Sequence, residues 1–316
     1  MTVKNHSKIC LCVSCLIMVI ALIMTITGNG INLGIDFAGG LSMQYNLNGD
    51  GTAAKDAAEG ATAVTFDQTT ALADTKAVLS ELNVGSFTVT AQGTSEVYIR
   101  VKDVAEESIQ GLQLSFEQKM TEKGYLNLQQ TGDVSYVGPV AGQTLVSNAI
   151  WSVVIAAALM LIYIAIRFDV NSGLAAVFGL MHDVLIMLSF MVLLRSIIEM
   201  NSSFIAAMLT IVGYSINNTI VIFDRIRENV KKAPNEDRVT LVNTSIKECL
   251  GRTINTTLTT LITIVALYVL GVDSIKEFAL PIIIGIISGV YSANMINGYV
   301  WAFLENKKLA RKAAKK

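Results

Sequence analysis

Six long apolar runs constrain this chain more than any other feature of its sequence. A helix of about 20 apolar residues is long enough to cross the hydrocarbon core of a bilayer. Runs of suitable length are residues 9–27, 149–166, 174–194, 204–223, 253–270 and 279–304. The 316-residue chain is 52% hydrophobic and 16% charged, a balance unlike that of an ordinary soluble domain. The sequence therefore predicts an α-helical membrane protein with six transmembrane helices.

The lysine and arginine residues predict how the chain crosses the membrane, because cytoplasmic loops carry an excess of them. Seven lie between the fourth and fifth runs and six follow the sixth run, whereas the loops after the third and fifth runs hold only Arg195 and Lys276. Both termini are therefore expected in the cytoplasm. Residues 1–28 would form the N-terminus and first helix, 149–304 the other five helices, and 305–316 a basic tail.

Residues 29–148, between the first two predicted helices, form a hydrophilic segment large enough to fold as a domain. Residue patterns predict strands at 41–47, 87–91, 96–101 and 133–137, helices at 68–82 and 104–123, and a flexible connection at 48–65. The order βαββαβ indicates a ferredoxin-like α+β domain, which the orientation above makes extracytoplasmic. From residue 28 to 148, six basic residues stand against fourteen acidic ones, a net charge of −8, while the whole chain carries −1.

The fourth run contains polar residues that a membrane helix does not carry without partners. Asn217 and Asn218 lie within it, and Asp224 and Arg225 follow where the helix is expected to leave the membrane. An unpaired amide is costly in hydrocarbon, so both asparagines are expected to face protein or a wet cavity. Hydrogen bonding between helices and a transport role are equally favoured by the residues alone. Asp224 is expected to pair with Arg227, three positions further on.

Ionisable residues also interrupt the third and fifth runs. His182 and Asp183 lie in the third run; adjacent residues point about 100° apart on a helix, so the two need not share a site. Arg252 precedes the fifth run, and Thr256 and Thr260 follow on one helical face. This strip suits a wet path into the membrane. Taken by position alone, however, Arg252 more often anchors a helix to lipid phosphates, and such threonines often bond their own backbone.

Sequence motifs of several enzyme classes are missing from the chain. It has no phosphate-binding Gly-Lys-Ser/Thr loop, no nucleophile elbow and no cluster of His and Cys at metal-ligand spacing. We therefore expect no enzymatic activity, no metal site and no cofactor.

Several separated stretches resemble the SecF family of bacterial protein-export membrane proteins, and together they cover essentially the whole chain. They are Gly213-Tyr214-Ser215-Ile216-Asn217-Asn218-Thr219 with Phe223-Asp224-Arg225-Ile226-Arg227-Glu228, Gly34-Ile35-Asp36-Phe37-Ala38-Gly39-Gly40, Val137-Gly138-Pro139-Val140, Leu180-Met181-His182-Asp183-Val184 and Arg252-Thr253-Ile254-Asn255-Thr256. Two positions depart from the family pattern. Ala38 stands where the family often has Thr, and Asn218 stands where it usually has Asp.

The resemblance implies a subunit of the Sec export machinery in the bacterial cytoplasmic membrane. The implied partners are SecD, the SecYEG channel with its SecA motor, YajC as a further candidate, the unfolded exported polypeptide and membrane lipid, with no nucleic acid. A proton or sodium gradient would drive late export, with Arg252 acting beside the family's intramembrane Asp. Asp36, Gly39 and Gly40 are expected to shape the hinge after the first helix.

Because Asn218 is an amide and does not bind a proton at any relevant pH, the sequence does not identify the group that carries the coupling charge. Asp183 is one substitute, an acid of the partner SecD is another, and a sodium ion held by asparagine oxygens is a third. Two other functions also stay open. One is a small-molecule or lipid exporter of the resistance-nodulation-division type, and the other is a membrane scaffold without transport.

Overall fold

The computed structural model describes residues 3–48, 67–92, 95–102, 104–132, 134–195, 198–271 and 273–314. The chain divides into two compact units. The helical unit consists of Met1–Asn32 and Asn148–Lys316, and the sheet unit consists of Leu33–Ser147. From residue 49 on, the flexible connection expected at 48–65 lies outside the described residues.

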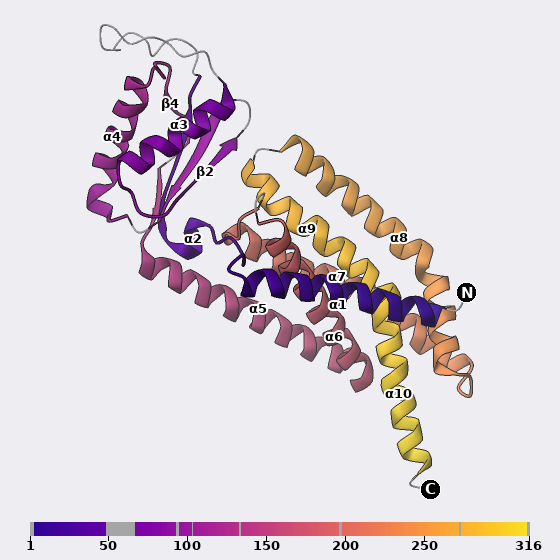
Figure 1. Ribbon diagram of the computed structural model, residues 1–316. Coiled ribbons are helices and arrows are strands. Elements are labelled where there is room, and N and C mark those ends of the chain that lie inside the picture. The colour runs from indigo at the N-terminus through magenta and orange to yellow at the C-terminus, as the bar shows by residue number, and fades with distance from the viewer. Residues whose placement is uncertain are drawn as a thin grey trace. The chain divides into compact units, whose positions relative to one another are not determined.

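In the described part of the chain, six helices are long and apolar enough to cross a membrane, as predicted (Figure 1). In chain order they are α1 (Val3–Ile26), α5 (Pro139–Arg167), α6 (Val170–Leu193), α7 (Ser202–Lys232), α8 (Arg238–Leu270) and α9 (Asp273–Ser292). Helix α9 continues through a π-helical segment (Ala293–Asn297) into α10 (Gly298–Ala313). The sequence did not predict this interruption of the last span.

Side-chain caps mark where three of these helices begin. Asp169, Asn201 and Asp237 stand directly before α6, α7 and α8, and each accepts a hydrogen bond from a backbone N–H of the first turn, at 3.2, 3.1 and 3.0 Å. Such caps satisfy N–H groups that have no partner inside the helix. Helices α7 and α8 extend beyond the apolar runs at 204–223 and 253–270 because helical bonding continues into their polar, solvated ends.

Glycines bring α9 and α7 into close contact. A Cβ atom on Gly285 would lie 2.5 Å from the Ile211 side chain, and one on Gly289 would lie 3.1 Å from that of Ser215. The two glycines are four residues apart, the small-xxx-small spacing typical of closely packed membrane helices. This close approach brings Ser215 to the face of α9 on which the candidate site is built.

The sheet unit is an antiparallel sheet with helices from the same segment. Its strands are β1 (Gly40–Asn46), β2 (Phe87–Gln92), β3 (Glu96–Val101), β4 (Gln129–Gln130) and β5 (Ser135–Val137). Their order is β2-β3-β1-β4, β5 also pairs with β1, and every pairing is antiparallel. All four predicted strands are present. Strand β4 is additional, and its two residues are too few to give a recognisable pattern.

Two helices and a 3-10 turn of this unit follow the first strand in the sequence: α3 (Gln68–Glu81), the turn Glu106–Ser108 and α4 (Ile109–Glu122). The predicted helix at 104–123 is therefore split into a turn and a shorter helix. The core is apolar: Met43 and Ile99 from the sheet and Phe116 from α4 have no exposed surface. Burial of such side chains is the main force that folds the unit.

Backbone geometry explains the glycine pair at the start of β1. The short helix α2 (Ile35–Ala38) contains Asp36 and is followed by Gly39, with φ of +74°, and Gly40, with φ of +124°. Residues with a side chain rarely adopt such angles. A Cβ atom on Gly40 would also lie 2.4 Å from the backbone oxygen of Val101 on β3. The chain therefore needs glycine here to enter the sheet, and a hinge role for Asp36 stays a prediction.

Candidate functional site

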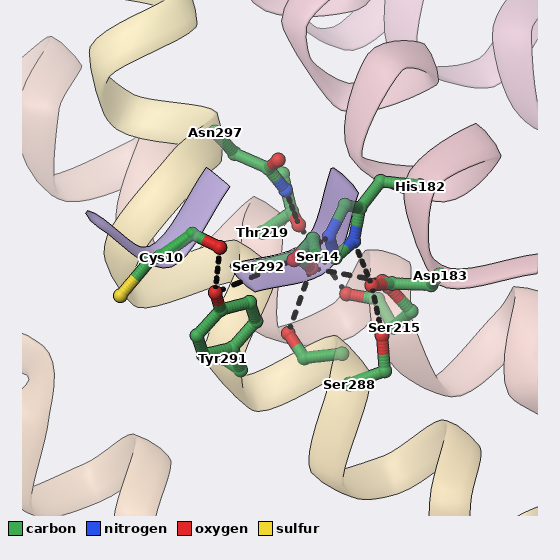
Figure 2. Close-up of polar contacts among 11 residues, drawn as sticks. Cys10, Ser14, His182, Asp183, Ser215, Thr219, Ser288, Tyr291, Ser292 and Asn297 are labelled. Carbon is green, nitrogen blue, oxygen red and sulfur yellow. Dashed lines mark hydrogen bonds and ion pairs between the residues drawn. The ribbon is translucent and has the colours of Figure 1, made fainter. Parts of the chain in front are cut away.

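A carboxylate with no exposed surface lies inside the helical unit. It belongs to Asp183 of α6, and Figure 2 shows the donors that converge on it. The Ser288 hydroxyl donates a hydrogen bond to Oδ1 at 2.8 Å, the Ser292 hydroxyl donates to Oδ2 at 2.9 Å, and the Ser215 hydroxyl donates to Oδ2. His182 Nδ1 lies 3.0 Å from Oδ1. A carboxylate has about four acceptor positions, so this one is fully satisfied.

Helix geometry explains why these donors meet. Ser288 and Ser292 are four residues apart, so both lie on one face of α9. Ser215 reaches the same place from α7 because Gly289 leaves room for the close approach of the two helices. A carboxylate inside a membrane helix is costly unless it is paired and hydrogen-bonded. These donors therefore stabilise Asp183 in the interior.

His182 extends the network to α1. Its Nε2 atom lies 2.7 Å from Ser14 Oγ, the Ser14 hydroxyl donates to the Tyr291 hydroxyl at 3.3 Å, and the Tyr291 hydroxyl donates to the backbone carbonyl of Cys10. The imidazole ring also stacks on the Tyr291 ring, with 6.0 Å between centroids. His182 and Asp183 therefore share one site, although their adjacent positions on a helix do not by themselves bring two side chains together.

Buried amides surround this cluster. Asn297, in the π-helical segment, donates to Thr219 Oγ1 at 2.9 Å (Figure 2). Among the described residues, Oδ1 of Asn294 and of Asn297 and Nδ2 of Asn218 are buried without a hydrogen-bond partner. Unpaired buried polar atoms are uncommon, and π-helical segments recur at functional sites. Asn218 is thus buried against protein, as expected, whereas its neighbour Asn217 is exposed.

Asn217 belongs to a polar strip on the outer surface of α7 and α8. Tyr214, one turn earlier on α7, has its hydroxyl 3.4 Å from both the Thr256 carbonyl and Thr260 Oγ1 on α8. The two threonine hydroxyls donate to backbone carbonyls one turn back, those of Arg252 and Thr256, at 2.9 and 3.0 Å. The sequence left two hypotheses for these threonines, a wet path into the membrane and hydrogen bonding to their own backbone, and the second of these contacts is present. The strip nevertheless presents polar groups on helices that are otherwise apolar.

Arg252 lies outside the Asp183 cluster. It is exposed on α8 and lines a pocket of about 560 Å³. The other charged side chains that line it come from α5, α7 and α8, and are Arg167, Asp224, Arg225, Arg227, Glu228, Lys231 and Glu248. The structure therefore divides these candidate residues among a buried cluster around Asp183, the polar strip on α7 and α8, and a charged pocket around Arg252.

The ion pairs of this pocket differ from the expected one. Asp224 pairs with Arg167 of α5, at 3.4 Å, instead of pairing along its own helix with Arg227. An exposed pair within one helix contributes only about 0.2–0.5 kcal/mol, so a cation from a neighbouring helix competes easily. Arg225 Nε lies 2.7 Å from Oε2 of Glu248 on α8. These exposed pairs link α5, α7 and α8, and each adds little stability alone.

Sequence reasoning missed four residues of the buried cluster: Ser14, Ser288, Tyr291 and Ser292. Each looks like an ordinary packing residue in an apolar helix. A signal was nevertheless present, because Ser288 and Ser292 have the spacing that places two hydroxyls on one helical face.

Similarity to known proteins extends over most of the chain. Residues 116–307 match the family described as Protein export membrane protein SecD/SecF, C-terminal, and residues 25–48 match the SecD/SecF GG Motif. The chain is 34% identical over 286 residues to protein translocase subunit SecF of Endomicrobium trichonymphae, covering 89% of this chain and 84% of that one. It is 33% identical over 309 residues to the SecF subunit of Thermodesulfovibrio yellowstonii, covering 96% and 94%.

A solved structure shares the fold. The crystal structure of SecDF, a translocon-associated membrane protein from Thermus thermophilus, matches with a TM-score of 0.78 and 30% sequence identity over 97% of this chain. The present chain spans 39% of that longer protein. The matched glycine motif includes Gly39 and Gly40, whose backbone angles require glycine. The chain therefore belongs to the SecD/SecF family of protein-export membrane proteins, and it is similar to the SecF subunits over most of its length.

Proposed function

We propose that the chain is a SecF-type accessory subunit of protein export, and that it couples an ion gradient to late movement of the exported polypeptide. Its relatives are named protein translocase subunits. The observation that carries the coupling is Asp183, a carboxylate with 0% exposure in a membrane-spanning helix. Ionisable groups at such positions are costly and mark ion pathways. Asp183 is the group whose charge would respond to the gradient.

Asp183 is well placed to replace the acid that Asn218 cannot supply. Ser215 donates a hydrogen bond to Asp183, and Asn218 follows Ser215 by three positions on the same face of α7. The carboxylate thus comes from α6 and approaches the face of α7 that carries Asn218. An acid is therefore present in this part of the bundle, although Asn218 is an amide.

SecD is the proposed partner of the polar strip on α7 and α8. Asn217 and Thr256 are exposed on the isolated chain, and polar groups are unfavourable against lipid. A partner helix at this strip would remove that cost. An acid of SecD that faces Arg252 is the second candidate for the titrating group, and a sodium ion held by asparagine oxygens is the third.

The proposed topology follows the lysine and arginine bias, with both termini in the cytoplasm and domain boundaries at residues 28, 148 and 304. The sheet unit would then be an extracytoplasmic ferredoxin-like domain, a classification supported by its antiparallel order β2-β3-β1-β4. There it would meet the unfolded exported polypeptide. The charged pocket would face SecYEG and SecA, with YajC as a further partner. No catalytic chemistry, cofactor or nucleic acid enters the proposal.

The energy of the gradient is adequate for this task. One charge that crosses 100 mV gains about 2.3 kcal/mol. Because about 1.4 kcal/mol corresponds to a factor of ten, such a charge can bias a domain equilibrium roughly fifty-fold.

Ion flux in vesicles tests the proposal. The chain would be reconstituted with SecD and SecYEG, and trapped dyes would report proton or sodium entry under separate gradients while SecA drives export. Asp183→Asn is expected to reduce the coupled flux about tenfold or more, because an amide replaces the titrating group. Glu236→Gln, at an exposed position between α7 and α8, is the matched control.

The flux of each variant indicates which group carries the charge. Equal flux through the native and Asp183→Asn proteins would remove Asp183 from the proposal. If flux is then lost only in Arg252→Met, the titrating acid belongs to the SecD interface. If neither variant loses flux, the sodium ion held by asparagine oxygens is left as the candidate; if the native protein itself shows no gradient-driven flux, the scaffold function replaces the coupling function.

A further inference from the structure

We propose that Ser14 and Tyr291 lock the protonation pattern of His182, so that the imidazole exchanges a proton with Asp183 through Nδ1 alone. The inference rests on the proposed function in one respect, namely that Asp183 changes charge during export. It gives the first helix, α1, a part in the site, because Ser14 belongs to α1.

The lock begins at a fixed end of the hydrogen-bond network. A backbone carbonyl can only accept a hydrogen bond, so the Tyr291 hydroxyl donates its single hydrogen to the carbonyl of Cys10. The Tyr291 oxygen then accepts from Ser14, whose hydroxyl lies 3.3 Å away. The Ser14 hydroxyl has only one hydrogen, and this contact uses it. Only a lone pair of Ser14 is left to face His182.

In the proposed lock, His182 Nε2 carries the hydrogen of its 2.7 Å contact with Ser14 Oγ, and the Ser14 hydrogen stays on the longer 3.3 Å contact with Tyr291. Once Nε2 is protonated, only Nδ1 can gain or lose a proton. Nδ1 lies 3.0 Å from Asp183 Oδ1, and one proton occupies this contact. Transfer from Oδ1 to Nδ1 breaks the O–H bond, leaves its electron pair on the carboxylate and forms an N–H bond. The pair stays neutral as a whole.

Three serines hold the Asp183 carboxylate in place beside the imidazole. Ser215, Ser288 and Ser292 each donate a hydrogen bond to it. The network through Ser14 does not conduct the proton onward, because the carbonyl at its far end cannot release one. The proton must leave from the Asp183 side.

Among the described residues, two other ionisable groups belong to the network around the ring. Tyr291 faces it from α9, and Cys10 lies at the end of the network on α1. A phenol and a thiol are ordinarily uncharged at neutral pH. Helix α7 presents Ser215, which does not titrate. Asp183 is therefore the exchange partner of His182.

Histidine nitrogen NMR tests the lock directly. The chain has two histidines, His6 and His182, so His6→Gln leaves one imidazole to observe. The protein would be labelled with ¹⁵N-histidine, placed in lipid bilayers and titrated by solid-state NMR, which distinguishes protonated from bare ring nitrogens. We expect Nε2 to stay protonated throughout, while Nδ1 alone changes with pH.

Variants of the lock should change this pattern. Ser14→Ala removes the acceptor of Nε2, so the protonated Nε2 signal should be lost in favour of a ring that carries its hydrogen on Nδ1. Tyr291→Phe keeps the ring stacking but frees the Ser14 hydroxyl to donate to Nε2, with the same result. Ser14→Thr keeps a hydroxyl and should preserve the native pattern. Tyr299→Phe, which removes a hydroxyl bonded to Asn243, is the matched control.

A bare Nε2 in the native protein would overturn the lock. An unchanged spectrum in both Ser14→Ala and Tyr291→Phe would overturn it as well. These results are independent of ion flux. Lost flux in Asp183→Asn with an unchanged Ser14→Ala spectrum rejects the lock and keeps the coupling, whereas normal flux in Asp183→Asn removes Asp183 from the coupling.

Discussion

The sheet unit and the helical unit both have apolar cores, but the helical unit also buries a carboxylate. The sheet unit buries Leu41, Ile99 and Phe116 completely, whereas the helical unit keeps Asp183 inside and exposes apolar side chains such as Ile166. In water, burial of apolar surface stabilises a fold. In lipid the exterior is already apolar, so close packing and polar contacts between helices carry more of the stability. What each unit buries therefore indicates the solvent that surrounds it.

The apolar core of the sheet unit serves stability, whereas the buried carboxylate of the helical unit can also serve function. An apolar core such as that around Phe116 has one task, which is to hold the sheet and its helices together. A buried carboxylate costs stability unless its partners are kept in place, and it offers a charge that can change. The two kinds of interior should respond differently to substitution.

The largest effect is expected from Phe116→Ala in the sheet unit. Removal of a fully buried aromatic ring costs about 3–5 kcal/mol of unfolding free energy. Hydrogen exchange of the full-length protein in detergent should show the sheet unit opening while the helical unit stays protected. Leu114→Ala on the same helix, at a position that is 66% exposed, is the control and should change little. Equal protection in both variants would contradict an apolar core centred on this ring.

A smaller effect is expected from Asp183→Leu in the helical unit. The change leaves the donors of the cluster without their acceptor, at about 1–3 kcal/mol for each unsatisfied group. Serines can turn to their own backbone, and Ser292 already lies 3.2 Å from the Gly289 carbonyl, so the net loss should be about 2 kcal/mol. Thermal unfolding followed by tryptophan fluorescence would measure it, because Trp151 and Trp301 both belong to the helical unit.

Asp183→Asn keeps one acceptor oxygen and should lose less stability than Asp183→Leu. If Asp183→Leu is instead more stable than the native protein, the polar interior does not hold this unit together. The buried carboxylate would then distinguish the helical unit by its function and not by its contribution to stability.

The smallest effect is a pH dependence of the sheet unit. Burial, followed by the carboxylate of Glu117, raises the pKa of Tyr45, and burial, followed by Asp74, raises the pKa of Tyr125. In the unfolded chain both phenols ionise near pH 10, so the stability they contribute is complete below pH 10 and is lost as the pH rises. At pH 10.5 the loss should stay below about 1 kcal/mol for each tyrosine.

Hydrogen exchange of the sheet unit across this pH range would show the loss, after correction for the intrinsic exchange rate. Tyr45→Phe should remove one of the two contributions. A sheet unit whose stability is constant between pH 9 and 11 would mean that these phenols ionise equally in both states.

Much of the fold could be predicted because its signals are local. The apolar runs predicted all six spans, and two short strand patterns on either side of a turn predicted strands such as Glu96–Val101, where buried residues occupy every second position. Helix ends were less accurate, since α7 and α8 continue into polar sequence where hydropathy gives no signal. The π-helical segment Ala293–Asn297 has no composition that distinguishes it from an α-helix.

The candidate site was less predictable because its contacts join distant positions. Asp183 stood out as a charge within an apolar run, but its partner Ser288 lies 105 positions away, and Ser14 lies 168 positions from His182. Which hydroxyl meets which carboxylate depends on how the helices pack. Gly289, whose small size lets α7 approach, became meaningful only with the structure.

Gradient-driven export tests the role of Asp183 most directly. Vesicles holding SecD and SecYEG would carry the native protein, Asp183→Asn or Glu236→Gln, and late preprotein export by SecA would be timed with and without an imposed ion gradient. We expect the gradient to speed export with the native and Glu236→Gln proteins and to have no effect with Asp183→Asn, while export without a gradient is the same for all three. Equal stimulation of Asp183→Asn and the native protein would contradict a coupling role for this carboxylate.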